Sequence, residues 1–287
     1  KSYPQSRSHL EVDKKLKPKK SLGQNFLVNE KIYRFMTEEI APKEREIIIE
    51  VGPGEGVLTE HLTKSGAQIM AVEKDHRLIS LLKEKFKNQK NVTIVEGDIL
   101  RFDLGSVKRS NLGEIKINNY KLVGNIPYYL TSHLLRIVLE SWPKPKLILL
   151  MVQKEVAERI TAKPPQMNLL GLSVQFFAEV KIVKNVSKGN FRPIPKVDSS
   201  LIKIIPKPNY KLSTLNSKLL FKLAHAAFGS KRKQILNGLV GNLNLNKDLV
   251  KQKLAEAGIE SIRRPESLSI EEWERLTKIF WPEQSSA

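Results

Sequence analysis

Short runs of β-branched and aliphatic residues alternate with amphipathic stretches between residue 29 and about residue 206, and this alternation limits the possible folds most strongly. The runs predict strands at residues 46–51, 69–73, 92–95, 121–124, 147–152, 179–186 and 199–205. Helical patterns lie between the earlier strands, around residues 58–64, 78–86, 132–139 and 154–160. Strands that alternate with helices predict an α/β fold with a parallel sheet covered on both faces. The last two runs have no helix between them, so we expect a terminal hairpin that places one antiparallel strand in the sheet.

After Pro206 the β-branched runs stop and a helical period takes over. The apolar stripes are Leu215, Leu219, Leu223 and Ala227, then Leu249, Val250, Leu254 and Ala257, then Ile270, Trp273, Leu276 and Phe280. The last stripe follows Ser269-Ile270-Glu271-Glu272, a capping-box pattern. We therefore predict three parts: a basic flexible tail at 1–20, the α/β domain at 21–207 and a small all-helical domain at 208–287.

The charge of the chain favours a polyanionic partner. Lys and Arg number 49 against 30 Asp and Glu, a formal net charge of +19, and many of the cations lie in clusters. Such an excess creates a positive surface potential that attracts nucleic acid. A lysine-rich enzyme of high solubility is the alternative.

Cysteine is absent, which excludes disulfides, thiolate metal sites and a cysteine nucleophile. The five histidines include no i, i+4 pair, so we predict no metal site. The longest apolar run, residues 147–152, is a third of a membrane span, and the first residues are polar and basic, unlike a secretory signal.

A glycine-rich loop, Glu50-Val51-Gly52-Pro53-Gly54-Glu55-Gly56, follows the first long predicted strand. Glycines there let the backbone approach a ligand closely, so Gly52 and Gly54 are candidate cofactor contacts. Nicotinamide and flavin enzymes use similar loops. Glu73 ends the next strand, 21 residues after Gly52, where its carboxylate could accept hydrogen bonds from ribose hydroxyls. A solvated strand end is the alternative for Glu73.

Asp98 lies in Glu96-Gly97-Asp98-Ile99, directly after the third strand. A carboxylate there could accept a hydrogen bond from an adenine amino group, although a Gly-Asp turn would also explain the pattern. Loops at the carboxyl ends of successive parallel strands form the crevice in which open α/β sheets bind ligands.

Asn125-Ile126-Pro127-Tyr128 follows the fourth strand and suits methylation of an adenine amine. The amine lone pair is delocalised into the ring, so the protein must offer acceptors to its N–H bonds. The Asn125 side-chain oxygen and the Ile126 carbonyl could do so, Pro127 adds no competing N–H donor, and Tyr128 offers a ring face to the base. An Asn-Pro turn without chemistry is the alternative.

A stacked adenine must be swung out before it can enter such a pocket. Phe191, in the proline-rich loop Gly189-Asn190-Phe191-Arg192-Pro193-Ile194-Pro195, could supply a second face for the base. Phe191 could instead be a core residue.

Together these residues resemble the ribosomal RNA adenine dimethyltransferases, the KsgA family of bacteria. The resemblance runs from about Pro18 to Leu276. It is carried by residues 20–27 (Lys-Ser-Leu-Gly-Gln-Asn-Phe-Leu), 52–59, 125–128, 153–159 and 191–199. Residues 153–159 favour this branch over the large-subunit, antibiotic-resistance (Erm) methyltransferases.

The resemblance implies a Rossmann-like class I methyltransferase domain with S-adenosylmethionine as cofactor. It assigns cofactor contacts to Asn25, Leu27, Gly52, Glu73, Asp98 and Asn125, and adenine contacts to Tyr128 and Phe191. The implied substrate is a pair of adjacent adenosines in the loop of the 3′-terminal helix of small-subunit (16S) ribosomal RNA, each methylated twice. Ile126 stands where the family often has Leu.

Lys231, Arg232 and Lys233 in Phe228-Gly229-Ser230-Lys231-Arg232-Lys233 resemble a motif of the family's helical domain. Beside Arg263-Arg264 they suit a phosphate backbone, so we predict that they bind RNA. A solvated basic face is the alternative. The polar stretch 106–119 receives no role.

The leading hypothesis is therefore an enzyme that dimethylates adenosines of small-subunit ribosomal RNA during assembly of that subunit. We expect a cytoplasmic monomer with no membrane contact, although the basic tail leaves open a plastid or mitochondrial homologue. A ribosome-assembly or organellar transcription factor of the same fold, which mainly binds, is the second hypothesis, and a small-molecule methyltransferase is the third. Methyl transfer to RNA distinguishes the first two, and the salt dependence of substrate binding distinguishes the third.

Overall fold

The computed structural model describes residues 18–19, 23–102, 104, 119–208, 214–230 and 233–282. The predicted tail up to residue 17, residues 106–118, and the candidate RNA contacts Lys231 and Arg232 lie outside the described residues.

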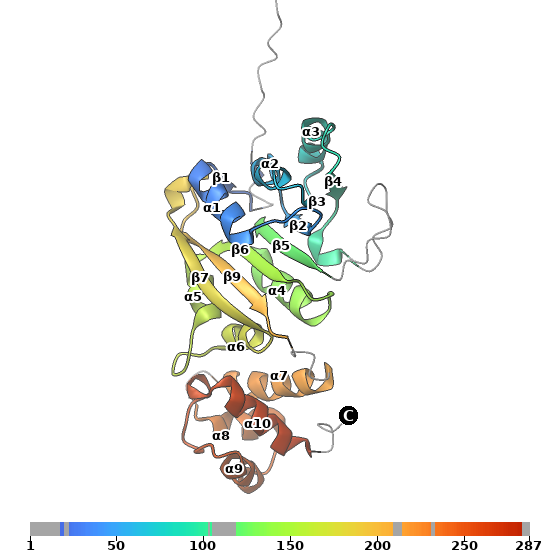
Figure 1. Cartoon of the computed structure of the whole chain (residues 1–287). Coiled ribbons are helices and arrows are strands. Elements are labelled where there is room, and N and C mark those ends of the chain that lie inside the picture. Colours follow the sequence, from blue (N-terminus) through green and yellow to red (C-terminus); the bar gives the residue numbers. More distant parts are fainter. Residues whose placement is uncertain are drawn as a thin grey trace, which may run out of the picture.

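A seven-stranded sheet forms the centre of the larger part of the molecule (Figure 1). Its strands are β2 (Ile47–Val51), β3 (Gln68–Glu73), β4 (Val92–Glu96), β5 (Tyr120–Asn125), β6 (Leu147–Gln153), β7 (Ala178–Val186) and β9 (Ser199–Pro206). Their order across the sheet is β4-β3-β2-β5-β6-β9-β7. The first five are parallel, and β9 pairs antiparallel with both β6 and β7. The predicted α/β fold and its single antiparallel strand are confirmed.

Helices cover both faces of the sheet because its strands are apolar on both sides. In β2, Ile48 packs with α1 (Glu30–Ile40) and α2 (Val57–Thr63), whereas the adjacent Ile49 packs into the cluster that contains α4 (Thr131–Glu140). The remaining helices of this part are α3 (His76–Lys85), α5 (Lys154–Thr161) and α6 (Leu169–Gln175). The strand runs predicted from the sequence match the observed strands within one residue at nearly every end, whereas α1 and α6 were not predicted.

A second, two-stranded sheet lies beside the first and was not predicted. It pairs β1 (Phe26–Leu27) with β8 (Phe191–Arg192) in antiparallel register, with Leu27 opposite Phe191. Strands of two residues carry too little pattern to be detected in a sequence. This pair joins the N-terminal segment to the proline-rich loop.

Four helices follow the last strand and pack together at one end of the sheet (Figure 1). They are α7 (Thr214–Phe228), α8 (Ile235–Leu243), α9 (Lys247–Glu256) and α10 (Ile270–Phe280). The capping box at Ser269 is confirmed: its side chain accepts from Glu272 N, and the Glu272 side chain accepts from Ser269 N. Leu249 was placed in the apolar stripe wrongly, since 43% of it is exposed while its neighbour Val250 is buried. The helix α8 was not predicted.

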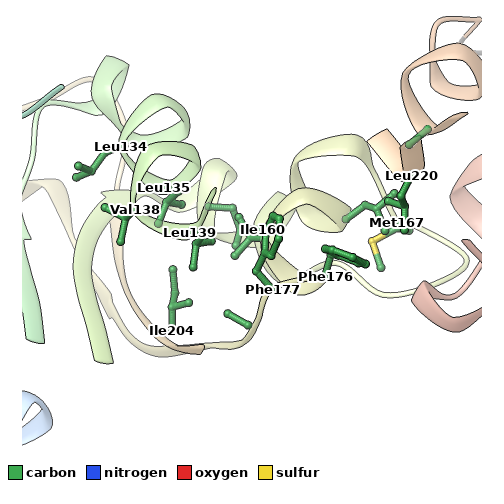
Figure 2. Packing of buried hydrophobic residues seen from close by; sticks show 14 of the residues in the cluster. Leu134, Leu135, Val138, Leu139, Ile160, Met167, Phe176, Phe177, Ile204 and Leu220 are labelled. Carbon is green, nitrogen blue, oxygen red and sulfur yellow. The ribbon is translucent and has the colours of Figure 1, made fainter. Parts of the chain in front are cut away.

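One hydrophobic cluster runs from the sheet into the four helices. At the junction, the Phe176 and Phe177 rings each lie 5.8 Å from the Phe221 ring on α7. Figure 2 shows this packing continuing from Leu139 on α4 through Ile160 to Phe177, and through Met167 to Leu220. The predicted domain boundary between residues 207 and 208 lies between β9 and α7. The hydrophobic core continues across this boundary.

Among the described residues, no helix has both the length and the apolar character that crossing a bilayer requires.

Candidate active site

A pocket opens at the carboxyl ends of β2, β3, β4 and β5, beneath the N-terminal segment at Gly23–Leu27. Parallel strands that end at one edge bring loops distant in sequence together there. Most of the residues singled out in the sequence line this pocket: Asn25, Leu27, Gly52, Gly54, Glu73, Asp98, Asn125, Ile126, Pro127 and Tyr128. Within the described residues, no three His, Asp or Glu side chains gather where they could hold a metal ion.

The glycine loop forms the floor of the pocket and needs its glycines for two reasons. Gly52 and Gly54 have φ of 65° and 60°, the left-handed region that side chains rarely adopt. A Cβ on Gly54 would also lie 3.1 Å from the Phe26 ring, which covers the loop from the N-terminal segment. The loop is therefore shaped for close approach by a ligand.

Glu73 is a buried carboxylate held by backbone N–H groups. Its Oε1 accepts from Lys74 N and Asp75 N, both at 2.9 Å, and its Oε2 accepts from Gly54 N at 3.3 Å. Burial raises the pKa of Glu73, and these N–H donors act in the opposite direction. A carboxylate has about four acceptor positions, so Oε2, with its one long bond, is the atom best placed to accept from a ligand.

Glu50 also lines the pocket and is almost fully buried. Its Oε2 accepts a hydrogen bond of 2.6 Å from the Thr59 hydroxyl. Burial raises the pKa of Glu50 to about 7, and the nearby Glu73 adds to the shift. Two carboxylates thus share one wall, an arrangement that suits a ligand carrying positive charge.

Asp98 caps the short helix η2 (Ile99–Arg101) and is paired with a lysine. Its Oδ1 accepts from Leu100 N at 3.1 Å, and its Oδ2 lies 2.8 Å from Lys74 Nζ. Burial opposes ionisation, but the Lys74 and Leu100 hydrogen bonds prevail and lower the pKa of Asp98. An ionised acceptor therefore lies across the pocket from the glycine loop.

Asn125 ends β5 with its amide group fixed. Its Nδ2 donates to the Asn25 carbonyl at 3.1 Å, which leaves Oδ1 as the acceptor. Among the described residues, nothing donates a hydrogen bond to Asn125 Oδ1 or to the Ile126 carbonyl. The position directly before it admits no side chain, because a Cβ on Gly124 would lie 2.6 Å from the Val51 carbonyl oxygen. Two acceptors thus stand at a fixed place on the pocket wall.

Tyr128 begins the short helix η3 (Tyr128–Leu130), and its hydroxyl lies 2.8 Å from the Ser199 hydroxyl on β9. The ring is half-buried and lines the pocket. Its neighbour Tyr129 also lines the pocket and is 57% exposed, so two aromatic rings from one loop border the opening.

The N-terminal segment is held over the pocket by Gln24, a residue that the sequence interpretation did not single out. Gln24 Nε2 donates to Asp75 Oδ2 at 2.9 Å, and Gln24 Oε1 accepts from Lys19 N at 2.8 Å. The fully buried Asp75 carboxylate is itself fixed by Arg77, which lowers the pKa of Asp75. The sequence gives no sign of the Gln24–Asp75 hydrogen bond, because the two residues lie 51 positions apart.

Phe191 does not line the pocket. It is fully buried in the core cluster that contains Leu27 and Leu201. Of the two sequence interpretations, the position in the structure favours the core residue. The Phe191 backbone pairs with Leu27, so Phe191 helps to position the N-terminal segment over the pocket.

The basic residues of the helical part are only partly described. Lys233 is exposed, and Arg263 is beside it, since the Arg263 carbonyl accepts from Ile235 N at 2.8 Å. Arg263 is nevertheless not a free cation. Its guanidinium pairs with both carboxylate oxygens of Glu272, at 2.5 and 3.0 Å, and donates to the Ser267 carbonyl. Arg264 is exposed and has one long ion-pair contact, 3.9 Å between its guanidinium and the Glu266 carboxylate.

Residues 15–280 match the model of the family described as ribosomal RNA adenine dimethylase. The chain belongs to the ribosomal RNA adenine dimethylase family. The resemblance read from the motifs is thereby confirmed, and so is the enzyme class: an S-adenosylmethionine-dependent ribosomal RNA adenine dimethyltransferase.

Individual relatives agree with this assignment. The chain is 42% identical over 261 residues to ribosomal RNA small subunit methyltransferase A of Dehalococcoides mccartyi, covering 91% of this chain and 88% of that protein. It is 38% identical to the protein of the same name from Bacillus pumilus, with 91% of each chain covered.

Two solved structures share most of the fold. The dimethyladenosine transferase from Plasmodium falciparum has a TM-score of 0.72 at 27% identity, covering 88% of this chain and 95% of that one. The 23S rRNA methyltransferase ErmE has a TM-score of 0.69 at 25% identity, covering 89% and 99%. Since a 23S rRNA methyltransferase also shares the fold, the fold alone does not identify the RNA that this chain modifies.

Proposed function

We propose that this protein transfers methyl groups from S-adenosylmethionine to the amino nitrogens of two adjacent adenosines in the 3′-terminal helix loop of small-subunit ribosomal RNA, twice on each. The observation that carries the proposal is the Asn125 amide, whose nitrogen is tied to the Asn25 carbonyl so that its oxygen remains an acceptor in the pocket. The names of the 42% and 38% identical relatives support the small subunit as the target.

The residues of the pocket fit the cofactor. Glu73 Oε2 would accept from a ribose hydroxyl, Asp98 from the adenine amino group, and the Gly52–Gly54 backbone would lie along the methionine part. The positive charge of the sulfonium and ammonium groups would favour the ionised forms of Glu50 and Glu73, whose pKa values burial raises in the free protein. When bound, the cofactor supplies a methyl group already activated by its sulfonium.

The protein's own part in the reaction is to position the amine. Asn125 Oδ1 and the Ile126 carbonyl would accept the two N–H bonds of the adenine amine, which localises the nitrogen lone pair. Pro127 offers no donor to compete, and the Tyr128 ring would stack on the base. Positioning of this kind accounts for on the order of 7–11 kcal/mol of barrier reduction at best, and it needs no side chain that titrates near neutrality.

We further propose that the enzyme acts as a single chain on the assembling small subunit in the cytoplasm. A purely binding role as an assembly or transcription factor is less well supported, because a factor that only binds has no need of the fixed acceptors at Asn125 and Ile126.

The test is transfer of tritiated methyl groups from labelled cofactor to small-subunit ribosomal RNA. Asn125→Ala should lower the transfer rate by about 100-fold or more, the loss typical when one preorganised transition-state contact is removed. Asn185→Ala, a change of an exposed asparagine on β7, is the control and should transfer at the normal rate. Equal labelling by wild type and Asn125→Ala would reject the site.

Two further measurements locate the substrate. Reverse-transcription stops on RNA from cells with and without the protein should map to two adjacent adenosines of the small subunit. Raising salt from 50 to 200 mM should weaken RNA binding by orders of magnitude if six or more phosphates are contacted. A flat response would instead favour a small-molecule substrate.

A further inference from the structure

Four large apolar side chains are exposed on or next to segments that contact the pocket. Of the eight described residues of this kind, Tyr129 lines the pocket, Val28 follows the pocket-lining Leu27, and Ile194 and Val197 lie in the loop after Arg192, the β8 partner of the pocket-lining Phe26. Monomeric proteins rarely gather such residues without a partner to cover them. We propose that Ile194 is a wedge that enters the RNA base stack beside the target adenosine and keeps that adenosine extruded; this rests on the proposed function.

The loop at 193–198 that carries Ile194 is fixed to the pocket at both ends. Before it, Arg192 pairs with Phe26, which lines the pocket. After it, the Ser199 hydroxyl lies 2.8 Å from the Tyr128 hydroxyl. The loop that carries Ile194 is thus tied to the segment that covers the pocket and to Tyr128, the ring that would stack on the base.

The loop is also stiffened internally. Pro193 and Pro195 flank Ile194 and restrict the backbone on both sides. The Asp198 carbonyl accepts from Lys154 N at 3.0 Å, and its carboxylate accepts from Lys188 N at 2.9 Å. A stiff loop presents Ile194, 58% exposed, without losing much conformational entropy on binding.

The charges around Ile194 suit RNA better than a protein partner. Arg192 and Lys196 are exposed on either side of it, with Lys188 and Lys154 close by on segments bonded to the loop. The carboxylate of the loop, Asp198, already accepts a backbone N–H. An aliphatic side chain between cations matches bases flanked by phosphates.

Extrusion of a base creates the need that such a wedge would meet. Removing the base from the stack costs a few kcal/mol of free energy, and an apolar side chain inserted between the remaining bases compensates part of this cost. Phe191, on the same segment, is fully buried and is not available for this contact.

The test uses a hairpin RNA of the target loop with 2-aminopurine at the target adenosine, mixed with enzyme and S-adenosylhomocysteine. The fluorescence of 2-aminopurine rises when the base leaves the stack. Ile194→Ala should reduce this rise by about tenfold per bound complex, and Ile194→Met should restore most of it. Ile262→Ala, a change of a 65% exposed isoleucine in the helical part, is the matched control and should behave as wild type. Because Ile194 is exposed, Ile194→Ala should unfold at the normal temperature.

Three results would overturn the proposal. One is an equal fluorescence rise with Ile194→Ala and wild type. Another is weaker RNA binding by Ile194→Ala with an unchanged rise per complex, which would make the loop a docking surface only. The third is tight capture of a protein partner by wild type, lost in Ile194→Ala, while extrusion is unaffected. If the wild-type enzyme fails to methylate the unmodified hairpin and the intact subunit alike, the proposed function fails instead.

Discussion

The pocket and the helical part of this methyltransferase carry charge in opposite ways. In the pocket the acidic groups Glu50 and Glu73 are buried, and Glu73 is fixed by three backbone N–H groups. In the helical part the cations Lys233 and Arg264 lie on the surface, and Arg263 is paired with Glu272. Ligand binding in the pocket therefore depends on the positions of individual atoms. Attraction of RNA to the helical part depends mainly on the total positive charge.

This contrast teaches where a single substitution should matter. A buried acceptor with fixed partners cannot be replaced by its neighbours, so its loss should be felt fully. A surface cation contributes one part of a screened field, and its neighbours continue to supply the rest.

The largest effect is expected from Glu73→Ala. Loss of the buried hydrogen-bond acceptor for the cofactor ribose should weaken S-adenosylmethionine binding by about 100-fold, measured by calorimetry. Glu96→Ala is a matched control, because Glu96 is the cross-strand partner of Glu73 yet is exposed and outside the pocket. Similar weakening in both variants would mean that the strand ends, not the Glu73 carboxylate, determine binding.

The next effect is a pH dependence of stability due to Glu50. Its pKa of about 7 lies above the ordinary value of 4.5, so the folded protein retains a proton that the unfolded chain releases. The resulting stabilisation is complete below about pH 4.5 and is lost as the pH rises through 7. Glu50→Gln stays neutral, so its free energy of unfolding relative to wild type should increase by about 2 kcal/mol between pH 5 and pH 8. Urea denaturation without cofactor measures it, and a constant difference would contradict the assignment.

A smaller effect is expected from Gln24→Ala. Without the hydrogen bond to Asp75, the N-terminal segment loses one fixed anchor over the pocket, and cofactor affinity should fall by about tenfold. Gln252→Ala removes an exposed side-chain hydrogen bond in α9 and should leave affinity unchanged. If Gln24→Ala binds cofactor normally, the contacts of Asn25 and Gly23 are sufficient to hold the segment.

The smallest effects are expected in the helical part, where two adjacent arginines should separate. Arg263→Ala breaks a half-buried pair and should lower the free energy of unfolding by about 1 kcal/mol. Arg264→Ala should leave stability unchanged and lower the slope of RNA affinity against salt by about one charge. Denaturation and salt titrations of both variants test this. If Arg263→Ala lowers the salt slope and Arg264→Ala lowers the free energy of unfolding, then Arg263, not Arg264, faces the RNA.

The strands and most of the pocket could be predicted because their signals are local. A run such as Leu147-Ile148-Leu149-Leu150-Met151-Val152 is apolar on both faces, and such runs form central parallel strands. The carboxyl ends of these strands then bring Gly52, Glu73, Asp98 and Asn125 to one edge by topology alone.

What could not be predicted depends on contacts between distant segments. The Gln24–Asp75 bond, the β1–β8 pair and the burial of Phe191 each join parts of the chain that carry no shared pattern. Aromatic type alone cannot say whether a ring faces a pocket or a core, and this is why Phe191 was a candidate for the pocket whereas Tyr129, which lines it, was not singled out. Likewise, Arg263 and Arg264 look equivalent in sequence but differ in their partners: both carboxylate oxygens of Glu272 hold Arg263, whereas the exposed Arg264 has a single 3.9 Å contact with Glu266.

The unbroken packing of Phe176 and Phe177 against Phe221 has a consequence for target choice. If the helices grip the RNA backbone, as proposed, their rigid attachment to the sheet sets a constant span between that grip and Asn125. The enzyme would then act as a ruler, selecting adenosines by how far they lie from the held duplex. Lengthening the hairpin stem by one base pair should shift or abolish modification even when the loop sequence is kept.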